Sequence, residues 1–311
     1  MHTQPSAARH SRRAVLGLGL GAAVAATGVT ALTGGSAHAA TGPDTRRLLA
    51  ALEQEHGVRL GVFARNLSTG RTVRYRADEP FPMCSVFKTV AVAAVLRDLD
   101  HDGEFLARRI HYTEADITRS GGRESSLVTR EDRNLANGMT VAELCQAAID
   151  HSDNTAGNLL LRELGGPTAV TGFCRSIGDG VTRLDRWEPE LNTAEPERTT
   201  DTTTPQAIAR TYRRLVLGHA LPPAKREQIT GWLRGNTTSK ERFRKGLPAD
   251  WTLADKTGSG RYGTANDVGI AWTPAGAPVV LAVLTTKPDE AAPRDEPVIA
   301  RTATLLAQAL V

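Results

Sequence analysis

The order of secondary-structure patterns in this 311-residue chain predicts an α/β (α+β) protein with two domains. Two strand patterns lie near the beginning of the chain and three near its end, and residues with helical periodicity fill most of the interval between them. Strands from both ends can form one sheet that the terminal helices cover, while the middle helices pack as a second domain. We therefore assign residues 40–80 and 235–311 to a discontinuous α/β domain and residues 81–234 to an all-helical domain.

Residues 1–39 have the pattern of an export signal. Arg12 and Arg13 precede a Gly- and Ala-rich apolar run that ends in Ala37-His38-Ala39, which is typical of a twin-arginine (Tat) signal peptide cut after Ala39. A membrane anchor is the alternative, because the apolar run is nearly long enough to span a bilayer, but its Gly and Ala content makes it weakly hydrophobic. We expect a secreted protein that leaves by the Tat route and has no membrane attachment after cleavage.

Composition gives no reason to expect nucleic acid or a cofactor as a partner. The chain has 38 basic and 34 acidic residues, but residues 1–39 contain three arginines and no acid, so 35 basic residues face 34 acidic ones in the remainder. No metal-ligand cluster and no glycine-rich phosphate loop occur. Cys145 and Cys174 lie in apolar helical patterns and are expected to be buried free thiols, although a single disulfide stays open.

The α/β domain begins with a helix and a hairpin. Asp44–Glu55 carries apolar side chains at helical spacing and precedes Gly57, a typical C-terminal glycine. Val58–Leu67 and Thr72–Arg76 then have strand composition and are joined by a short loop that contains Gly70, which predicts a β-hairpin.

The segment after the hairpin combines a buried helix with a serine and a lysine. Thr89–Leu96 is apolar on every face, which predicts burial. Ser85 and Lys88 are three residues apart and lie on one helical face. A buried lysine needs a partner, and Ser85 beside it, near the positive end of the helix dipole, is a candidate nucleophile. In the alternative, Ser85 only caps the helix and Lys88 extends to solvent.

Helices and irregular stretches alternate in the middle of the chain. The residues between Arg119 and Gly138 have no clear period and predict a loop or a mobile flap, and residues 179–203 form a long segment that is functional or disordered. The expected helices run from Thr140 to Asp150, from Asn154 to Gly165, from Pro167 to Ile177, from Pro205 to Gly218 and from Ala224 to Leu233.

Strand patterns return after Gly246. Three strands are predicted at Trp251–Lys256, Ala265–Trp272 and Val279–Thr286, and a last helix is predicted from Pro297 to Ala309.

Four short motifs stand in order along the chain. They are Ser85-x-x-Lys88, Ser152-Asp153-Asn154, Glu188-x-x-x-Asn192 and Lys256-Thr257-Gly258. Each alone fits a purely structural explanation: a helix cap, a turn between helices, a loop acid, or a strand that leads into a turn. Each short tripeptide is expected by chance in roughly a few per cent of chains of this length, so the ordered set is far rarer.

Together the motifs resemble the signature of the class A (serine) β-lactamases, a family of the penicillin-recognising serine enzymes. The resemblance covers nearly all of residues 41–311 and includes the segment Arg186-Trp187-Glu188-Pro189-Glu190-Leu191-Asn192. It implies a two-domain β-lactamase/transpeptidase-like fold, in which an antiparallel sheet flanked by terminal helices adjoins an all-helical domain that holds the catalytic loop 183–201. It also implies a monomeric enzyme that hydrolyses β-lactam antibiotics, confers resistance and needs no cofactor or metal.

The resemblance assigns the chemical steps to particular residues. Ser85 would attack the β-lactam carbonyl, with Lys88 or Glu188 as the acylation base, a choice that stays open. Ser152, held by Lys88 and Lys256, would pass a proton to the leaving nitrogen. Glu188 would activate the water that hydrolyses the acyl-enzyme.

Further residues would bind the substrate or support the loop. The backbone N–H groups of Ser85 and Ser259 would form the oxyanion hole. An Arg186–Asp201 ion pair and a contact between Glu188 and Asn158 would hold the loop, and the Glu188–Pro189 bond is expected to be cis. The substrate-binding set would be Asn154, Asn192, Lys256, Thr257, Ser259 and Arg242.

The chain departs from the family pattern at two places. The stretch Arg119–Arg133 is several residues longer than the usual loop at the mouth of the cleft. Some carbapenem-hydrolysing relatives pair a cysteine at the position of Cys84 with one just after the Lys-Thr-Gly motif. Gly260 stands there in this chain, so no such bridge is expected.

A guanidinium that binds the substrate carboxylate comes from one of two places in such enzymes. One is the strand position that here holds Ala265, and the other is the segment with Arg242 and Arg244. The alanine leaves the second source, and the spacing to Lys256 favours Arg242. The alternative is that Arg242 is a solvated arginine in a basic run.

Two rival functions share the first chemical step. A secreted D-Ala-D-Ala carboxypeptidase or transpeptidase, and a non-catalytic β-lactam sensor, would also be acylated at Ser85. Glu188 and Asn192 argue against both, because a stable acyl-enzyme needs no positioned hydrolytic water.

Overall fold

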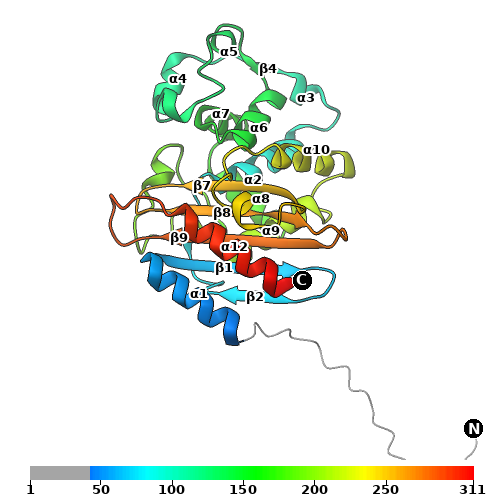
Figure 1. Cartoon of the computed structure of the whole chain (residues 1–311). Coiled ribbons are helices and arrows are strands. Elements are labelled where there is room, and N and C mark those ends of the chain that lie inside the picture. Colours follow the sequence, from blue (N-terminus) through cyan, green and yellow to red (C-terminus); the bar gives the residue numbers. More distant parts are fainter. Residues whose placement is uncertain (1–42) are drawn as a thin grey trace, which may run out of the picture. The chain divides into compact units, whose positions relative to one another are not determined.

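A five-stranded antiparallel sheet runs through the structure, a computed structural model that describes residues 43–311 (Figure 1). The strands are β1 (Arg59–Asn66), β2 (Thr72–Tyr75), β7 (Thr252–Ser259), β8 (Ala265–Trp272) and β9 (Pro278–Thr286). Their order is β2-β1-β9-β8-β7, so the first hairpin pairs with the last strand of the chain. β1 and β9 are in register from Arg59 with Thr286 to Asn66 with Val279.

The two terminal helices cover one face of this sheet (Figure 1). They are α1 (Pro43–His56) and α12 (Glu296–Leu310), and the short helix α11 (Phe243–Gly246) packs on α12. Their apolar side chains form one core with strand residues such as Leu60, Val62 and Val283. A Cβ at Gly246 would lie 2.0 Å from the carbonyl oxygen of Ala300, so only glycine allows α11 to approach α12 this closely.

The helices of the middle segment form a second core with the other face of the sheet. α9 (Pro205–Val216) packs on β1, β8 and β9 and begins as predicted, because Thr204 Oγ1 accepts from Ala207 N and Pro205 is the first helical residue. The other helices are α2 (Phe87–Ala94), α3 (Glu104–Ala107), α4 (Glu114–Arg119), α5 (Asp132–Asn137), α6 (Val141–Asp150), α7 (Asn154–Leu164), α8 (Thr168–Ser176) and α10 (Pro223–Arg234).

The helix that carries Lys88 is buried over its whole length, as predicted. A 3₁₀ turn, η1 (Cys84–Val86), leads into α2, and a π-helical turn, η2 (Val95–Leu99), follows it. α2 packs against α6, α7, α8 and α10, while η1 packs against β7 and β8. These neighbours leave no face of the helix for solvent, which explains its uniformly apolar sequence.

Most predicted elements are confirmed within three residues of their expected ends, and the two-domain fold with an antiparallel sheet is confirmed. The capping box at the start of α6 is present, since Thr140 Oγ1 accepts from Glu143 N at 3.2 Å and the Glu143 carboxylate accepts from Thr140 N at 2.7 Å. The helix after Thr204 ends at Val216 instead of Gly218.

The stretch between Arg119 and Gly138 is not the structureless loop or flap that was predicted. It contains a 3₁₀ turn, η3 (Arg123–Ser125), and the six-residue helix α5. Its centre is fixed by the buried Asp153, whose Oδ2 accepts from the backbone N–H groups of Val128 and Thr129 at 2.9 Å each. Helical segments this short show no hydrophobic period, so the pattern could not predict them.

Two short ladders were also missed. β3 (Phe81–Pro82) pairs with β6 (Thr202–Thr203), and β4 (Arg109–Ile110) pairs with β5 (Met139–Thr140). A final 3₁₀ turn, η4 (Glu190–Thr193), lies inside the long segment 179–203. The first ladder anchors the end of that segment next to η1.

Several predictions of domain and targeting are not tested by these contacts. The described residues all lie in one compact unit, so the boundaries at 80/81 and 234/235 stay predictions. The signal peptide 1–39, with Arg12, Arg13 and its cleavage after Ala39, lies outside the described residues. Within residues 43–311, no helix combines the length and the apolar character that crossing a bilayer requires.

Candidate active site

A cavity of about 300 Å³ lies where η1, the start of α7 and the end of β7 face one another. Glu124, Ser125 and Leu127 also line it, so the stretch after Arg119 reaches this cavity. The predicted site residues that line it are Ser85, Ser152, Asn154, Asn192, Arg242, Thr257 and Ser259.

Ser85, Lys88 and Glu188 come within hydrogen-bond distance of one another beside this cavity. Lys88 Nζ lies 3.0 Å from both Ser85 Oγ and Glu188 Oε1, and Ser85 Oγ lies 3.1 Å from Glu188 Oε1. The side chains of Lys88 and Glu188 have no exposed surface, whereas Ser85 is 6% exposed. A serine hydroxyl can pass its proton to a carboxylate or to a neutral amine, so the nucleophile has two candidate bases, Glu188 and the deprotonated form of Lys88.

Acceptors surround the ammonium group of Lys88. Nζ also donates to Asn154 Oδ1 and to the main-chain oxygen of Ser152, both at 2.7 Å. A Cβ at Gly157 would lie 2.9 Å from Lys88 Cε, so glycine in α7 makes room for the lysine stem. The alternative in which Lys88 extends to solvent is therefore wrong. Lys88 contacts Ser152 through its carbonyl and not through the hydroxyl that the expected proton relay would use.

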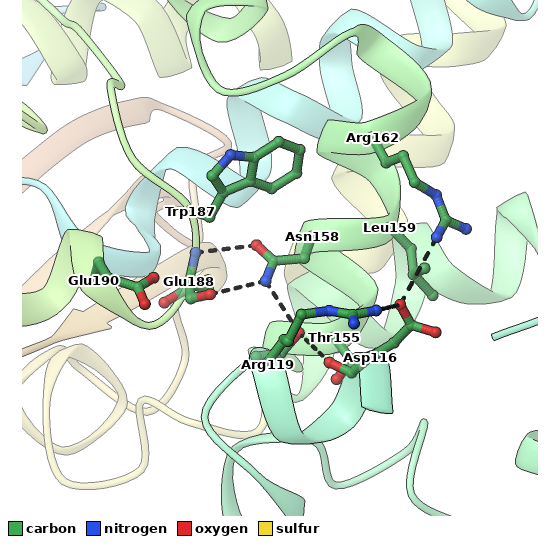
Figure 2. Close-up of a pocket in the computed structure, with 10 residues that line it drawn as sticks. Asp116, Arg119, Thr155, Asn158, Leu159, Arg162, Trp187, Glu188 and Glu190 are labelled. Atoms are coloured by element: carbon green, nitrogen blue, oxygen red, sulfur yellow. Dashed lines mark hydrogen bonds and ion pairs between the residues drawn. The ribbon is translucent and has the colours of Figure 1, made fainter. Parts of the chain in front are cut away.

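Asn158 in α7 holds the main chain of Glu188, as Figure 2 shows. Its Oδ1 accepts from Glu188 N at 3.0 Å, and its Nδ2 donates to Glu188 O at 2.9 Å and to Ser120 Oγ at 3.0 Å. The Glu188–Pro189 bond is cis, as expected. On the side-chain end, Asn192 Nδ2 donates to Glu188 Oε2. Hydrogen bonds to the main chain and to the carboxylate of Glu188 thus both hold this residue in place.

A buried aspartate, Asp201, anchors the loop that carries Glu188. Asp201 is 1% exposed, and its Oδ1 accepts from the backbone N–H groups of Asp185 at 2.8 Å and Arg186 at 2.9 Å. Arg186 Nε donates to its Oδ2 at 2.5 Å. The expected Arg186–Asp201 ion pair is confirmed, and it anchors the loop through a buried carboxylate and a partly exposed guanidinium.

A second cavity of about 420 Å³ is bordered by Asn158 and Glu188 (Figure 2). Charged side chains of α4 and α7 also line it, and Arg119 and Arg162 both turn toward Asp116, at 2.6 and 3.9 Å. Because Ser85 does not line this cavity, we assign the chemistry to the cavity of about 300 Å³.

Lys256 directly precedes Thr257, which lines the active-site cavity, but Lys256 itself is not among the lining residues. It is fully buried in β7, and its Nζ donates to the carbonyl of Thr257 at 3.0 Å. Burial, followed by the positive charge of Lys88, lowers the pKa of Lys256 to about 7. An anion bound beside Lys256 would therefore favour its charged form at neutral pH.

Arg242 is buried, so its description as a solvated arginine is wrong. It is 2% exposed, and its Nη1 donates to the carbonyls of Gly258 at 2.9 Å and Asn266 at 2.7 Å. Its Nη2 donates to Ser259 Oγ at 2.7 Å and faces Glu296 Oε1 at 3.1 Å. The guanidinium is thus fixed at the cavity wall beside the end of β7.

Three contacts near the cavity were not foreseen from the sequence. Arg244, the less favoured of the two candidate arginines, has its Nη2 3.2 Å from the fully buried Asp255. Asp153 caps α7 and also holds the stretch after Arg119. Thr238 and Thr257 share a hydrogen bond through their hydroxyl groups. The motif Ser152-Asp153-Asn154 could have indicated the cap, but its distant partners are visible only in the fold.

The cysteines and potential metal ligands add no further chemistry to the site. Cys84, Cys145 and Cys174 are free thiols, and the expected absence of a bridge between Cys84 and position 260 is confirmed. Within residues 43–311, no group of three or more His, Cys, Asp or Glu side chains could hold a metal ion. The expectation that no cofactor is needed stays a prediction.

Comparisons with known proteins agree on one family. The model of the β-lactamase enzyme family matches residues 44–310. A β-lactamase of Streptomyces lavendulae is 65% identical over 305 residues, which cover 97% of this chain and 98% of that protein. A β-lactamase of Streptomyces fradiae is 63% identical over the same length and coverage. The solved structure of a β-lactamase from Streptomyces albus G, 62% identical, superposes with a TM-score of 0.85 and covers 86% of this chain and 100% of that one.

Proposed function

Because the chain belongs to the β-lactamase enzyme family and is a class A β-lactamase, we propose that it hydrolyses the amide of penicillins and cephalosporins through an acyl-enzyme on Ser85. The observation that carries this proposal is the contact of Ser85 Oγ with both Lys88 Nζ and Glu188 Oε1. A serine that only capped a helix would need neither partner. Destruction of the β-lactam ring outside the cell would protect the producer from these antibiotics.

In the first step Ser85 Oγ attacks the β-lactam carbonyl and transfers its proton to Lys88 or Glu188. Both candidate bases lie at nearly the same distance, so the acylation base stays open. The N–H groups of Ser85 and Ser259 stabilise the oxyanion. A Cβ at Gly258 would lie 2.8 Å from the carbonyl of Met83, so glycine allows β7 to approach η1 and supports a shared oxyanion hole. As the ring C–N bond breaks, Ser152 at the cavity wall gives its hydroxyl proton to the nitrogen and regains a proton from the base that deprotonated Ser85.

In the second step a water molecule attacks the acyl-enzyme. Glu188 accepts a proton from the water and returns one to Ser85 Oγ as the ester bond breaks. Asn192, which lines the cavity and donates to Glu188 Oε2, helps to hold the water. Asn158, Arg186 and Asp201 keep the loop in place. This step separates a β-lactamase from a protein that stays acylated.

The carboxylate that lies beside the ring in ordinary β-lactams binds at the other end of the cavity. Lys256 supplies charge, while the hydroxyls of Thr257 and Ser259 line the wall. Arg242 Nη2 is 2.7 Å from Ser259 Oγ and adds a guanidinium that is well suited to a carboxylate. Asn154 lies at the same wall, where it orients Lys88 and meets the side-chain amide of the substrate.

A single substitution tests the nucleophile. Ser85→Ala should lower kcat/KM for benzylpenicillin by at least about 10³-fold, because no covalent intermediate can form. Ser68→Ala, in the exposed loop of the first hairpin, is the matched control and should hydrolyse as the wild type does. Intact-protein mass spectrometry should show the transient benzylpenicilloyl adduct on the wild type and none on Ser85→Ala. Wild-type turnover by Ser85→Ala would contradict the assignment.

The same measurement separates the enzyme from its rivals. A carboxypeptidase or a sensor would keep the adduct on the wild-type protein for long after mixing. A β-lactamase should clear it and return to free mass once the substrate is consumed.

We also propose that the enzyme is secreted by the Tat route, without membrane attachment after cleavage, on the basis of Arg12 and Arg13 in the leader. Changing both to Lys should leave precursor inside the cell, whereas Arg9→Lys, a nearby control, should not. Undiminished secretion of the double variant would point to another export route or to an anchor.

A further inference from the structure

Two buried carboxyl groups lie on neighbouring strands beside Lys256. Asp255 in β7 and Asp267 in β8 have no exposed surface. Asp267 is the register partner of Thr257, two residues after Asp255, so both carboxyl groups point to the same face of the sheet. They also lie within hydrogen-bond reach of each other. Two ionised carboxylates that share one dry site repel each other strongly.

The contacts of the pair indicate where one proton lies. Asp255 Oδ2 accepts from Asn236 Nδ2 at 2.8 Å, and its Oδ1 faces Arg244 Nη2 at 3.2 Å, so Asp255 is stabilised as an anion. Asp267 Oδ2 accepts from Phe243 N at 3.1 Å, but its buried Oδ1 has no hydrogen-bond partner among the residues that the structure describes. A proton on Asp267, donated to Asp255, supplies the missing hydrogen bond.

The surroundings favour this state at neutral pH. Burial raises the pKa of Asp255, and burial followed by the charge of Asp255 raises the pKa of Asp267 well above its ordinary value. The pair therefore retains one proton and carries a single negative charge.

This charge acts electrostatically on both cations of the substrate-binding wall, Lys256 and Arg242. Asp255 directly precedes Lys256, and Asp267 holds the backbone N–H of Phe243, which directly follows Arg242. Asp255 and Asp267 raise the pKa of Lys256, while Lys88 and Arg242 lower it. The charged or titratable groups that face the pair or Lys256 are Lys88 from α2, Asp150 from α6, Tyr212 from α9, and Arg242 and Arg244 near α11.

We propose that Asp255 and Asp267 share one proton and act as positioning residues. The single negative charge of the pair keeps Lys256 protonated for the substrate carboxylate. The hydrogen bond from the backbone N–H of Phe243 to Asp267 holds Arg242 at the cavity. The role toward Lys256 rests on the proposed function, because it requires the carboxylate to bind there. The shared proton does not depend on that function.

Thermal unfolding against pH tests the proton. Above about pH 4 the unfolded chain releases this proton, whereas the folded chain keeps it. Since the folded state then binds more protons, wild-type stability falls as pH rises, until the folded pair itself ionises. Asp267→Asn mimics the protonated carboxyl and cannot ionise. Its Tm relative to the wild type should therefore rise steadily from about pH 5 to about pH 8. A difference that is independent of pH would overturn the shared proton.

The pH profile of kcat/KM tests the link to Lys256. Asp267→Asn keeps one negative charge on Asp255, so its alkaline limb should coincide with that of the wild type. The double variant Asp255→Asn/Asp267→Asn has none, so its limb should move to lower pH by on the order of one unit, the size that a neighbouring charge imposes. An unmoved limb in the double variant would overturn the role, even if kcat/KM fell uniformly at every pH.

A control variant, and a measurement that does not depend on the proposed function, complete the test. Asp179→Asn removes another buried carboxylate, whose partners are Thr182 and Thr211, and should lower Tm without moving the limb. If the wild type did not hydrolyse β-lactams, the proposed function would fail, while the Tm measurement on Asp267→Asn would still decide the shared proton. The same measurement decides it if the double variant does not fold.

Discussion

The two walls of the active-site cavity use their buried charges differently. On the catalytic wall, the ammonium of Lys88 and the carboxylate of Glu188 lie 3.0 Å apart and both contact Ser85. On the substrate-binding wall, Lys256 and Arg242 donate mainly to main-chain carbonyls. On the first wall the two charges pair with each other before any ligand arrives, whereas on the second the ammonium group of Lys256 donates to a carbonyl and to no carboxylate, so a substrate anion can bind it. Substitutions on the first wall should therefore alter chemical steps, and those on the second should alter binding.

The largest effect should come from Glu188→Ala on the catalytic wall. Loss of the general base should slow deacylation by about 10²–10⁴-fold, while some acylation remains through Lys88. Mass spectrometry after mixing with benzylpenicillin should show the full ligand mass persisting on Ser85. Glu190→Ala removes an exposed carboxylate of the same turn and should clear the adduct normally. Clearance by Glu188→Ala at the wild-type rate would place the base elsewhere.

Arg242→Ala should give the next largest effect, on the other wall. Loss of a charge-assisted pair costs about 1.5–3 kcal/mol, or roughly ten- to a hundredfold in kcat/KM if the transition state feels it. Steady-state kinetics should show this loss without a long-lived adduct, in contrast to Glu188→Ala. Lys240→Ala, an exposed neighbour in the same basic run, is the control and should change kcat/KM little. Equal losses in both variants would refute a specific role for Arg242.

A smaller and opposite effect is expected when Ala265→Arg is added to Arg242→Ala. Ala265 pairs with Ser259 in the ladder and faces the same side of the sheet, but it is fully buried. The space that Arg242 leaves should admit the new guanidinium and restore several-fold of the lost kcat/KM. Ala265→Arg alone has no such space and should lower Tm. No recovery in the double variant would indicate that the carboxylate does not lie near Ser259.

The smallest effect on catalysis should follow Arg244→Ala. Its guanidinium faces Asp255 and not the cavity, so kcat/KM at neutral pH should change less than about threefold. Stability should fall by about 1–3 kcal/mol, because the buried Asp255 loses a partner while Asn236 still donates to it. Thermal unfolding and kinetics on one preparation would check both. A loss of kcat/KM as large as that of Arg242→Ala would contradict the division between the two arginines.

The sequence predicted those parts of the fold and site whose determining residues all lie within one short segment of the chain. The buried helix after Ser85, the capping box at Thr140 and the N-cap at Thr204 depend on residues a few positions apart. The two-residue ladders are too short for any period, and the contact of Asp153 with Thr129 joins residues far apart in the chain. Asp255 and Asp267 become a pair only when β7 and β8 are in register, and no local sequence pattern predicts that register.

The site residues also divide into those that local sequence identifies and those that only the fold identifies. Motif and resemblance brought Ser85, Lys88 and Glu188 together correctly in space, because each is marked by its own neighbours in the sequence. Arg242 and Arg244 have similar sequence surroundings; the spacing to Lys256 favoured Arg242, but the different partners of the two guanidinium groups are visible only in the fold. The roles of these residues in catalysis stay predictions for the experiments above.

The pairing of β1 with β9 constrains how the chain can be made. β1 lies between β2 and β9, so one of its edges stays open until the last strand has been synthesised, more than 200 residues later. Contacts this distant in the chain form slowly, and an open hydrophobic edge invites association with other chains. A polypeptide that stops before Pro278 would therefore expose an incomplete sheet to proteases and chaperones. In such a polypeptide the Ser85 motif would lack the complete sheet that carries the substrate-binding wall. The sheet and the site that it supports are therefore completed only when β9 has been synthesised.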